Sequence, residues 1–195
     1  MSSSGSSWPE SSSRRSWLTG IALFAVALVV RLFFWQATPD RDWPYSAWYK
    51  GDAPVWMEYA QALHAGQAFE LGLPIHPPAA GYLVATLWNG LPSGIPWLRF
   101  CWVLMGALIV VLVYVAALRS FGFAVAAGAG FLCAVSSGLM VLGSSVNNEA
   151  PYLLLVIGSV ALFEDVRTRP GWPRLCAWSA LNGIACLFRV EHILY

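Results

Sequence analysis

The chain is organised around residues 49–91, which read YKGDAPVWMEYAQALHAGQAFELGLPIHPPAAGYLVATLWNGL. This stretch lies between strongly apolar segments, yet it gathers polar and ionisable side chains. Asp52 is a good helix N-cap, Pro54 suits a first helical turn, and Gly66 suits a helix end. These three residues predict a first short helix between Asp52 and Gly66.

The predicted helix is amphipathic, because apolar residues recur at positions i, i+3, i+4 and i+7 from Trp56 to Leu63. Such a helix is expected to lie along a membrane interface instead of crossing it. A second short helix is predicted from Pro78 to Leu91. It is apolar, but it is too short for an easy membrane crossing, so we expect it to be re-entrant or interfacial.

Composition indicates a polytopic membrane protein. Of the 195 residues, 58% are hydrophobic and 11% are charged, whereas a soluble domain is typically about 25% charged. The net charge of +1 gives no sign of nucleic-acid binding. The four cysteines fall in apolar segments without a CxxC pair, which indicates small core residues and neither disulfides nor a metal site.

The predicted fold is an all-α membrane bundle with about five transmembrane helices. Residues 1–16 are Ser-rich and are expected to form a disordered cytoplasmic tail, and residues 17–195 the membrane domain. Because the chain stops at Tyr195 inside an apolar segment, we expect it to be the N-terminal part of a longer protein. The predicted transmembrane helices are Trp17–Trp35, Trp97–Leu118, Phe121–Leu142, Ala150–Phe163 (extending toward Val166) and Leu175–Tyr195.

Basic residues predict the topology. If the first helix starts inside, Arg119 and the arginines of the 164–174 loop also lie inside, as the positive-inside rule requires. The 36–96 loop, with its two short helices, then lies on the extracytoplasmic face. We therefore expect an integral protein of the plasma (inner) membrane with a cytoplasmic N-terminus.

With this topology, acids and arginines gather beside an apolar groove at the outer face. A carboxylate can take a proton from an acceptor hydroxyl, and arginines can hold a lipid phosphate. Each residue also has a plainer explanation: Asp52 and Glu149 could serve only as a cap and a dipole partner at helix starts, and this is the commoner use of such acids. The polar candidates are Asp52, His64, Glu70, His76, Arg99, Glu149, Arg189, Glu191 and His192.

Other indications are weaker. Arg31, near the end of the first apolar helix, is expected to extend its side chain to the headgroups, with phosphate binding as the less favoured role. His64 and His76 could ligate a metal, but their spacing matches no standard site. Arg189 and Glu191 would not share a helix face, so no ion pair is assumed between them.

An ordered set of short motifs then resembles a known family. Arg31-Leu32 ends the first apolar helix, and Asp52 opens a helix with the pattern Tyr-Ala-x-x-Leu-x-x-Gly. Pro-Pro followed by Gly-Tyr-Leu begins at Pro77, Asn148-Glu149 opens the fourth membrane helix, and Leu-x-Arg ends in Arg189. From about Ala22 to Tyr195 the chain resembles the N-terminal part of GT-C-fold glycosyltransferases, in the protein mannosyltransferase and lipid A aminoarabinose transferase group.

The resemblance implies an inverting transfer of a sugar from a polyprenyl-phosphate donor to a lipid, glycan or protein acceptor on the extracytoplasmic side. It implies that Asp52 is the general base and that Glu149 is a second polar contact. It implies donor phosphate binding by Arg189 and, by position alone, Arg99. His76 and Tyr82 are the expected substrate contacts. No metal ligand is assigned, because Ala53 stands where the family often has a second acid. A divalent cation is still possible.

Two other function classes remain open at this point. The first is a non-catalytic membrane protein or fragment of the same fold, which would assemble with a partner. The second is a transporter or channel subunit, for which ionisable residues at the helix midplane would be expected. The central parts of the second to fourth predicted helices carry no charge, which counts against a transporter.

Overall fold

The computed structural model describes residues 10–37, 52–67 and 76–194, and within these ranges every regular element is helical. The predicted disordered tail before Glu10 and the polar loop before Asp52 lie outside the described residues, as does Glu70. The elements are α1 Glu10–Ala37, α2 Ala53–His64, α3 Pro78–Leu87, η2 Pro92–Gly94, α4 Ile95–Phe121, α5 Phe123–Val135, α6 Ser137–Leu142, α7 Glu149–Thr168, α8 Trp172–Phe188 and η3 Val190–Leu194.

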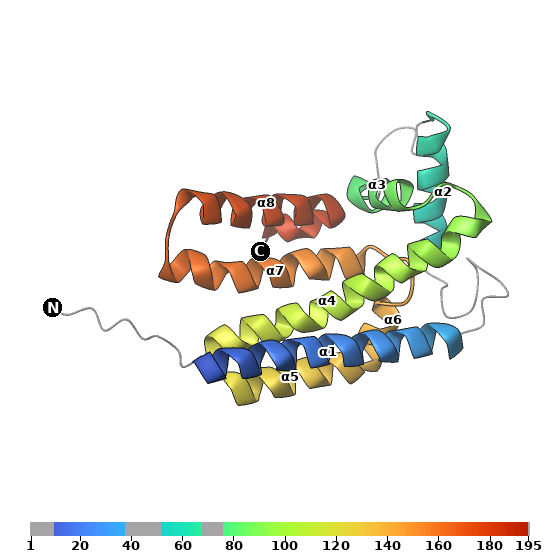
Figure 1. The fold of residues 1–195 in the computed structure, drawn as a ribbon. Helices are drawn as coiled ribbons and strands as arrows, with labels where there is room; N and C mark the ends of the chain where they lie inside the picture. Colours follow the sequence, from blue (N-terminus) through green and yellow to red (C-terminus); the bar gives the residue numbers. More distant parts are fainter. Residues whose placement is uncertain (1–9, 38–51, 68–75, 195) are drawn as a thin grey trace.

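The long helices pack side by side around α4. Helices α1, α5 and α7 all contact α4, and α8 packs on the far side of α7 (Figure 1). Successive long helices run in opposite directions, so α4 and α7 begin at the end of the bundle where α8 finishes. Helices α2 and α3 pack against each other at this same end, and α3 also contacts α4 and α8.

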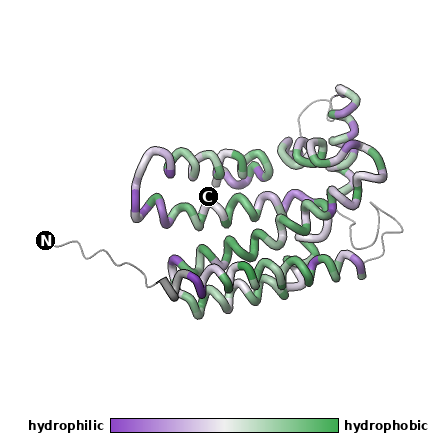
Figure 2. The backbone as a smooth tube through the Cα atoms, in the orientation of Figure 1, coloured by the Kyte–Doolittle hydropathy of each residue, from purple (hydrophilic) through white to green (hydrophobic). Residues whose placement is uncertain are grey.

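Two helices of the described chain are long and apolar enough to cross a membrane. They are the 24-residue stretch Arg14–Ala37 and the 30-residue stretch Pro92–Phe121. Hydrophobic residues run along α1, α4 and α5, whereas hydrophilic residues concentrate nearer the helix ends (Figure 2). Helix α3 has 10 residues and ends at Leu87, four residues before the predicted end. At 1.5 Å per residue it is about 15 Å long, half the thickness of a bilayer core.

The packing of α1, α4 and α5 relies on small residues. Their shared core, which we call the α1–α4 core, is formed by Leu23, Ala27, Ala107, Val110, Tyr114, Ala126 and Ala134. Burial of apolar surface gives little driving force inside lipid, so membrane helices associate through close packing. Small side chains allow this close packing. Gly130 serves such packing, because a Cβ there would lie 2.7 Å from the Leu23 side chain. A Cβ at Gly128, by contrast, would meet nothing within 4 Å.

Arg31 has neither of the roles that its position suggests. Its side chain is fully buried and donates hydrogen bonds to the carbonyl oxygens of Ala134 (3.4 Å) and Leu139 (3.3 Å). The Ala134 carbonyl lies in the last turn of α5, where a helix leaves its last carbonyls without intrahelical partners. The Leu139 carbonyl lies in α6 and also accepts from Gly143 N–H at 3.0 Å. Arg31 is therefore a structural residue, and its expected extension to the headgroups is wrong.

Helix boundaries differ from the prediction where the chain breaks. The predicted helix Phe121–Leu142 is divided at Ser136, which has an extended backbone and begins a Ser-Ser-Gly run. The predicted helix Leu175–Tyr195 ends at Phe188, where Arg189 is extended. Helix α1 begins at Glu10, so it includes the last residues of the Ser-rich segment.

A second core joins α2 and α3 to the bundle. We call it the α2–α3 core; it consists of Ala53, Trp56, Met57, Ala60, Ala80, Val84, Trp88, Leu98, Trp102, Val146, Ala150 and Phe188. Gly81 on α3 allows close contact with α2, because a Cβ there would lie 2.3 Å from the Tyr59 ring. The glycine of the Gly-Tyr-Leu motif is thus explained by the packing of α3 on α2.

Candidate active site at the α2–α3 end of the bundle

The structure brings residues that are adjacent in sequence to four predicted site residues into one core. Ala53, Leu98, Ala150 and Phe188 all belong to the α2–α3 core. In the sequence they adjoin Asp52, Arg99, Glu149 and Arg189 respectively. The backbone positions of two acids and two arginines from four separate helices therefore gather at one end of the bundle.

Asp52 occupies the predicted N-cap position of α2, but its side chain does not cap the helix. The carboxylate makes no capping hydrogen bond, and the residue is exposed. Its backbone carbonyl accepts the first helical hydrogen bond, from Trp56 N–H, at 3.0 Å. The carboxylate is therefore open to solvent.

Glu149 is the half-buried first residue of α7, and the capping of that helix is done by another side chain. Asn147 Oδ1 accepts a hydrogen bond of 2.8 Å from Ala150 N–H. Asn147 itself is held in place, because its carbonyl accepts from Trp102 Nε1 (3.0 Å) and its amide donates to the Leu142 carbonyl (2.9 Å). The need for a cap at this helix start is therefore met without the Glu149 carboxylate.

The two arginines lie in different surroundings. The Arg189 side chain is 40% exposed and follows the end of α8. Its guanidinium carbon lies 5.7 Å from the centroid of the Tyr152 ring, and its Nε lies 3.8 Å from a Glu191 carboxylate oxygen. An ion pair with Glu191 was not expected, and it forms because the helix ends before Arg189. Arg99 is fully buried, with its guanidinium carbon 5.1 Å from the Trp35 ring, so a phosphate would reach it only if the side chain were uncovered.

The remaining predicted residues lie on α2, on α3 and just before α3. His76 packs edge-on against Trp56, with ring centroids 5.5 Å apart. Tyr82 is 55% exposed and its ring is tilted against Tyr59 at 6.2 Å. His64 contacts the Trp88 carbonyl through Nε2 at 2.8 Å. Since a carbonyl only accepts, His64 donates there and links the ends of α2 and α3.

Three residues near the site were not predicted from the sequence to be site residues. Among the described residues, the buried atoms Trp56 Nε1 and Asn148 Oδ1 have no hydrogen-bond partner. Such unpaired atoms are uncommon in folded proteins and often indicate a functional position. Trp56 lies one turn after Asp52, and Asn148 directly precedes Glu149. Tyr152 lies under Arg189. The contact between Tyr152 and Arg189 does not follow from local spacing, because the two residues belong to different elements of the fold.

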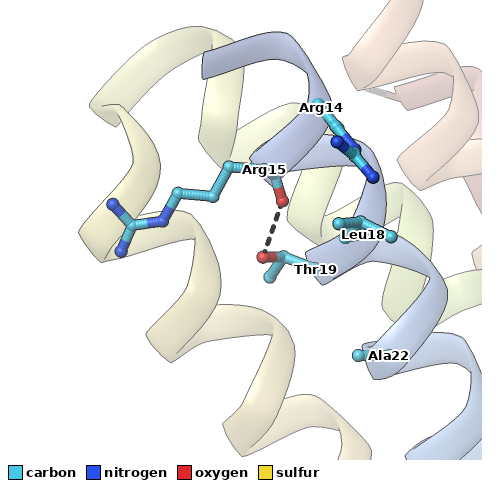
Figure 3. A pocket seen from close by; sticks show the side chains of 5 residues that line it. All are labelled: Arg14, Arg15, Leu18, Thr19 and Ala22. Atoms are coloured by element: carbon cyan, nitrogen blue, oxygen red, sulfur yellow. Dashed lines mark hydrogen bonds between the residues drawn. The ribbon is translucent and has the colours of Figure 1, made fainter. Parts of the chain in front are cut away.

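Two hollows lie at the opposite end of the bundle. One, of about 580 Å³, is lined by α1 residues that include Arg14, Arg15 and Thr19 (Figure 3). The other, of about 450 Å³, is an apolar groove between α1 and α4 that reaches from Phe24 to Arg119. Neither hollow contains a predicted site residue. Within the described ranges, no group of three or more His, Cys, Asp or Glu side chains could hold a metal ion.

A family model decides the identification. The model described as dolichyl-phosphate-mannose-protein mannosyltransferase matches residues 75–195, more than half of the chain. The chain belongs to this family. Members of the mannosyltransferase family are membrane glycosyltransferases, and the two long apolar helices agree with a membrane protein.

The match to the mannosyltransferase family covers some of the candidate site but not all of it. It includes His76, Arg99, Glu149 and Arg189, and it begins after Asp52. The role of Asp52 therefore stays a prediction from the resemblance of the outer loop. Comparison with curated proteins and with solved structures gives no match.

Proposed function

We propose that the protein transfers a sugar, such as mannose, from a polyprenyl-phosphate donor to an acceptor hydroxyl at the extracytoplasmic face. The observation that carries this proposal is the family match over residues 75–195. The gathering of Asp52, Glu149 and Arg189 around the α2–α3 core supports it, because a base, a second acid and a phosphate ligand are then supplied from one end of the bundle.

The proposed reaction is a single displacement. Asp52 takes the proton of the acceptor hydroxyl as its oxygen attacks the anomeric carbon from the side opposite the phosphate. The bond between the anomeric carbon and the phosphate oxygen breaks, and polyprenyl phosphate leaves with the electron pair. The configuration at the anomeric carbon is inverted. Glu149 contacts the sugar or acceptor, and Arg189 binds the phosphate on which negative charge develops.

His76, Tyr82 and Arg99 have supporting roles in this proposal. Tyr82 offers an exposed aromatic ring on α3 to the sugar or acceptor, and His76 lies beside the Trp56 ring at the start of that helix. Arg99 adds positive charge beneath the site from within the bundle. No step of this proposal uses a divalent cation.

We expect Arg189→Ala to raise the KM for the donor about 10-fold to 100-fold, because a charge-assisted hydrogen bond to phosphate is lost. The measurement is transfer from radiolabelled polyprenyl-phosphate mannose in membranes that contain the full-length protein. Arg174→Ala is the matched control, since Arg174 is an exposed arginine at the other end of α8. An unchanged donor KM in Arg189→Ala would remove Arg189 from the phosphate site.

The proposed orientation follows from the charges at the two ends of the bundle. Arginines gather at the end where α1 and α8 begin and where α4 and α7 finish, opposite the candidate site (Figure 1). They are Arg14, Arg15, Arg119, Arg167, Arg169 and Arg174. Arginine-rich ends of membrane helices face the cytoplasm, so the candidate site faces outward.

Cysteine labelling in intact cells tests this orientation. After replacement of the four native cysteines, Ser93→Cys places a thiol near the site end and Ser120→Cys near the arginine end; both serines are exposed. A membrane-impermeant maleimide is expected to label Ser93→Cys in intact cells and Ser120→Cys only after lysis. The reverse pattern would place the site in the cytoplasm and exclude an extracytoplasmic reaction.

A further inference from the structure

A chain of hydrogen bonds connects the end of α8 to α7. His192 in η3 is 9% exposed, and its two ring nitrogens contact side chains of two different helices. Nδ1 lies 3.1 Å from the Tyr152 hydroxyl on α7, and Nε2 lies 3.1 Å from Asn182 Oδ1 on α8. The Tyr152 and His192 rings also pack edge to face, with centroids 5.5 Å apart.

The direction of these hydrogen bonds is determined by Asn182. Its Nδ2 lies 2.8 Å from the Trp178 carbonyl oxygen, which can only accept, so the amide nitrogen faces that carbonyl. Nδ2 also donates to Ser159 Oγ at 2.8 Å. Asn182 Oδ1 therefore faces the imidazole and accepts from Nε2–H. His192 Nδ1 is then an acceptor and receives the Tyr152 hydroxyl proton.

The chain of hydrogen bonds reaches Tyr152, and the Tyr152 ring in turn contacts Arg189. Tyr152 contacts His192 through its hydroxyl, and its ring lies 5.7 Å from the Arg189 guanidinium carbon. The buried Phe188 anchors the preceding residue in the α2–α3 core. Arg189 is therefore oriented from two sides, by its buried neighbour and by the Tyr152 ring. Its pairing with Glu191 is solvent-exposed and easily exchanged for another anion.

We propose that Tyr152 and His192 are positioning residues that hold the Arg189 guanidinium in the orientation that binds the phosphate of the donor. This inference rests on the proposed role of Arg189 and deepens it. The hydroxyl bond to His192 limits rotation and tilting of the Tyr152 ring. The ring then offers Arg189 a fixed face, so that less side-chain entropy is lost when phosphate binds.

Three variants separate this role from ordinary packing. Tyr152→Phe keeps the ring beneath Arg189 but removes the hydroxyl bond. His192→Leu removes both bonds of the imidazole. His192→Gln can restore both, because the oxygen and nitrogen of an amide share one carbon, as the two imidazole nitrogens do, and supply one acceptor and one donor. A positioning role predicts weaker binding of polyprenyl phosphate in the first two variants and wild-type binding in the third.

The experiment measures the equilibrium Kd of the purified full-length protein for a short-chain polyprenyl phosphate, with thermal unfolding recorded for every variant. We expect Tyr152→Phe and His192→Leu to raise Kd about threefold to tenfold, and His192→Gln to stay within about twofold of wild type. When Arg189→Ala is also present, His192→Leu is expected to have no further effect on Kd, because the two changes act on one interaction.

Each other result has a distinct meaning. If Arg189→Ala weakens binding but His192→Leu does not, the positioning role fails and the proposed function stands. If His192→Leu lowers thermal stability and His192→Gln fails to restore Kd, the network is only structural. If the wild-type protein does not bind polyprenyl phosphate, or Arg189→Ala binds it normally, the phosphate role of Arg189 fails and this inference fails with it.

Discussion

Replacing Asp52 with asparagine is expected to slow sugar transfer about 100-fold to 10,000-fold, the usual contribution of a general base. Asparagine has nearly the shape of aspartate but cannot take a proton from the acceptor. The fold should be unaffected, because the Asp52 side chain makes no capping hydrogen bond and the residue is exposed. The measurement is the rate of transfer from polyprenyl-phosphate mannose at saturating donor, in membranes with matched amounts of full-length protein.

Glu58→Gln is the matched control for this experiment. Glu58 is an exposed acid on the same helix, and it does not share a helix face with Asp52. It should transfer sugar at the wild-type rate. Equal activity in wild type and Asp52→Asn would remove Asp52 from the chemistry. Because the family model begins at residue 75, that result would leave the family assignment intact and direct attention to Glu149 as the base.

Replacing Arg31 with alanine is expected to lower the free energy of unfolding by about 2–5 kcal/mol. The change removes a large buried side chain and leaves the last carbonyls of α5 and α6 without their cationic donor. In the apolar interior of a membrane bundle, water cannot replace that donor. The measurement is reversible denaturation of the purified protein in detergent, followed by near-UV circular dichroism of its tryptophans.

Arg119→Ala is the control for the loss of an arginine. Its guanidinium contacts Asp165 at 3.1 Å, but both side chains are more than a third exposed, so we expect a change of about 0–1 kcal/mol.

A second variant tests the packing around Arg31 without removing a charge. In Gly106→Ala the added Cβ would lie 2.7 Å from Arg31 Nε and 2.7 Å from the Gly143 backbone, which should destabilise by about 1–3 kcal/mol. Wild-type stability of both Arg31→Ala and Gly106→Ala would show that the α5–α6 break does not depend on Arg31.

Local features of the chain were predicted from the sequence because they depend on nearby residues. Pro54 and Gly66 predicted where α2 begins and ends, and Gly66 has the positive φ of 67° that favours glycine. The apolar run from Trp97 predicted the central helix α4 to within three residues at either end. The short motifs carried the family resemblance, which the match over residues 75–195 confirms.

The contacts between distant residues were decided only by the tertiary structure. Arg31 meets the carbonyls of Ala134 and Leu139, which lie more than 100 residues away in the sequence, and no local pattern indicates that pairing. Its position near a helix end therefore favoured a headgroup contact that the structure contradicts. Likewise, an acid at a helix start looks like a cap, but at α7 the cap is Asn147.

The candidate site shows the same division. Residue type and position in the chain determined that acids and arginines would lie near helix ends at one face, because helix starts and stops are set by Pro, Gly and polar residues. The folding of α2 and α3 onto α4, α7 and α8 decided which of these residues are exposed, and it buried Arg99 while leaving Arg189 open. It also brought Tyr152, Asn182 and His192 together, since side chains from three elements meet only when the helices have packed.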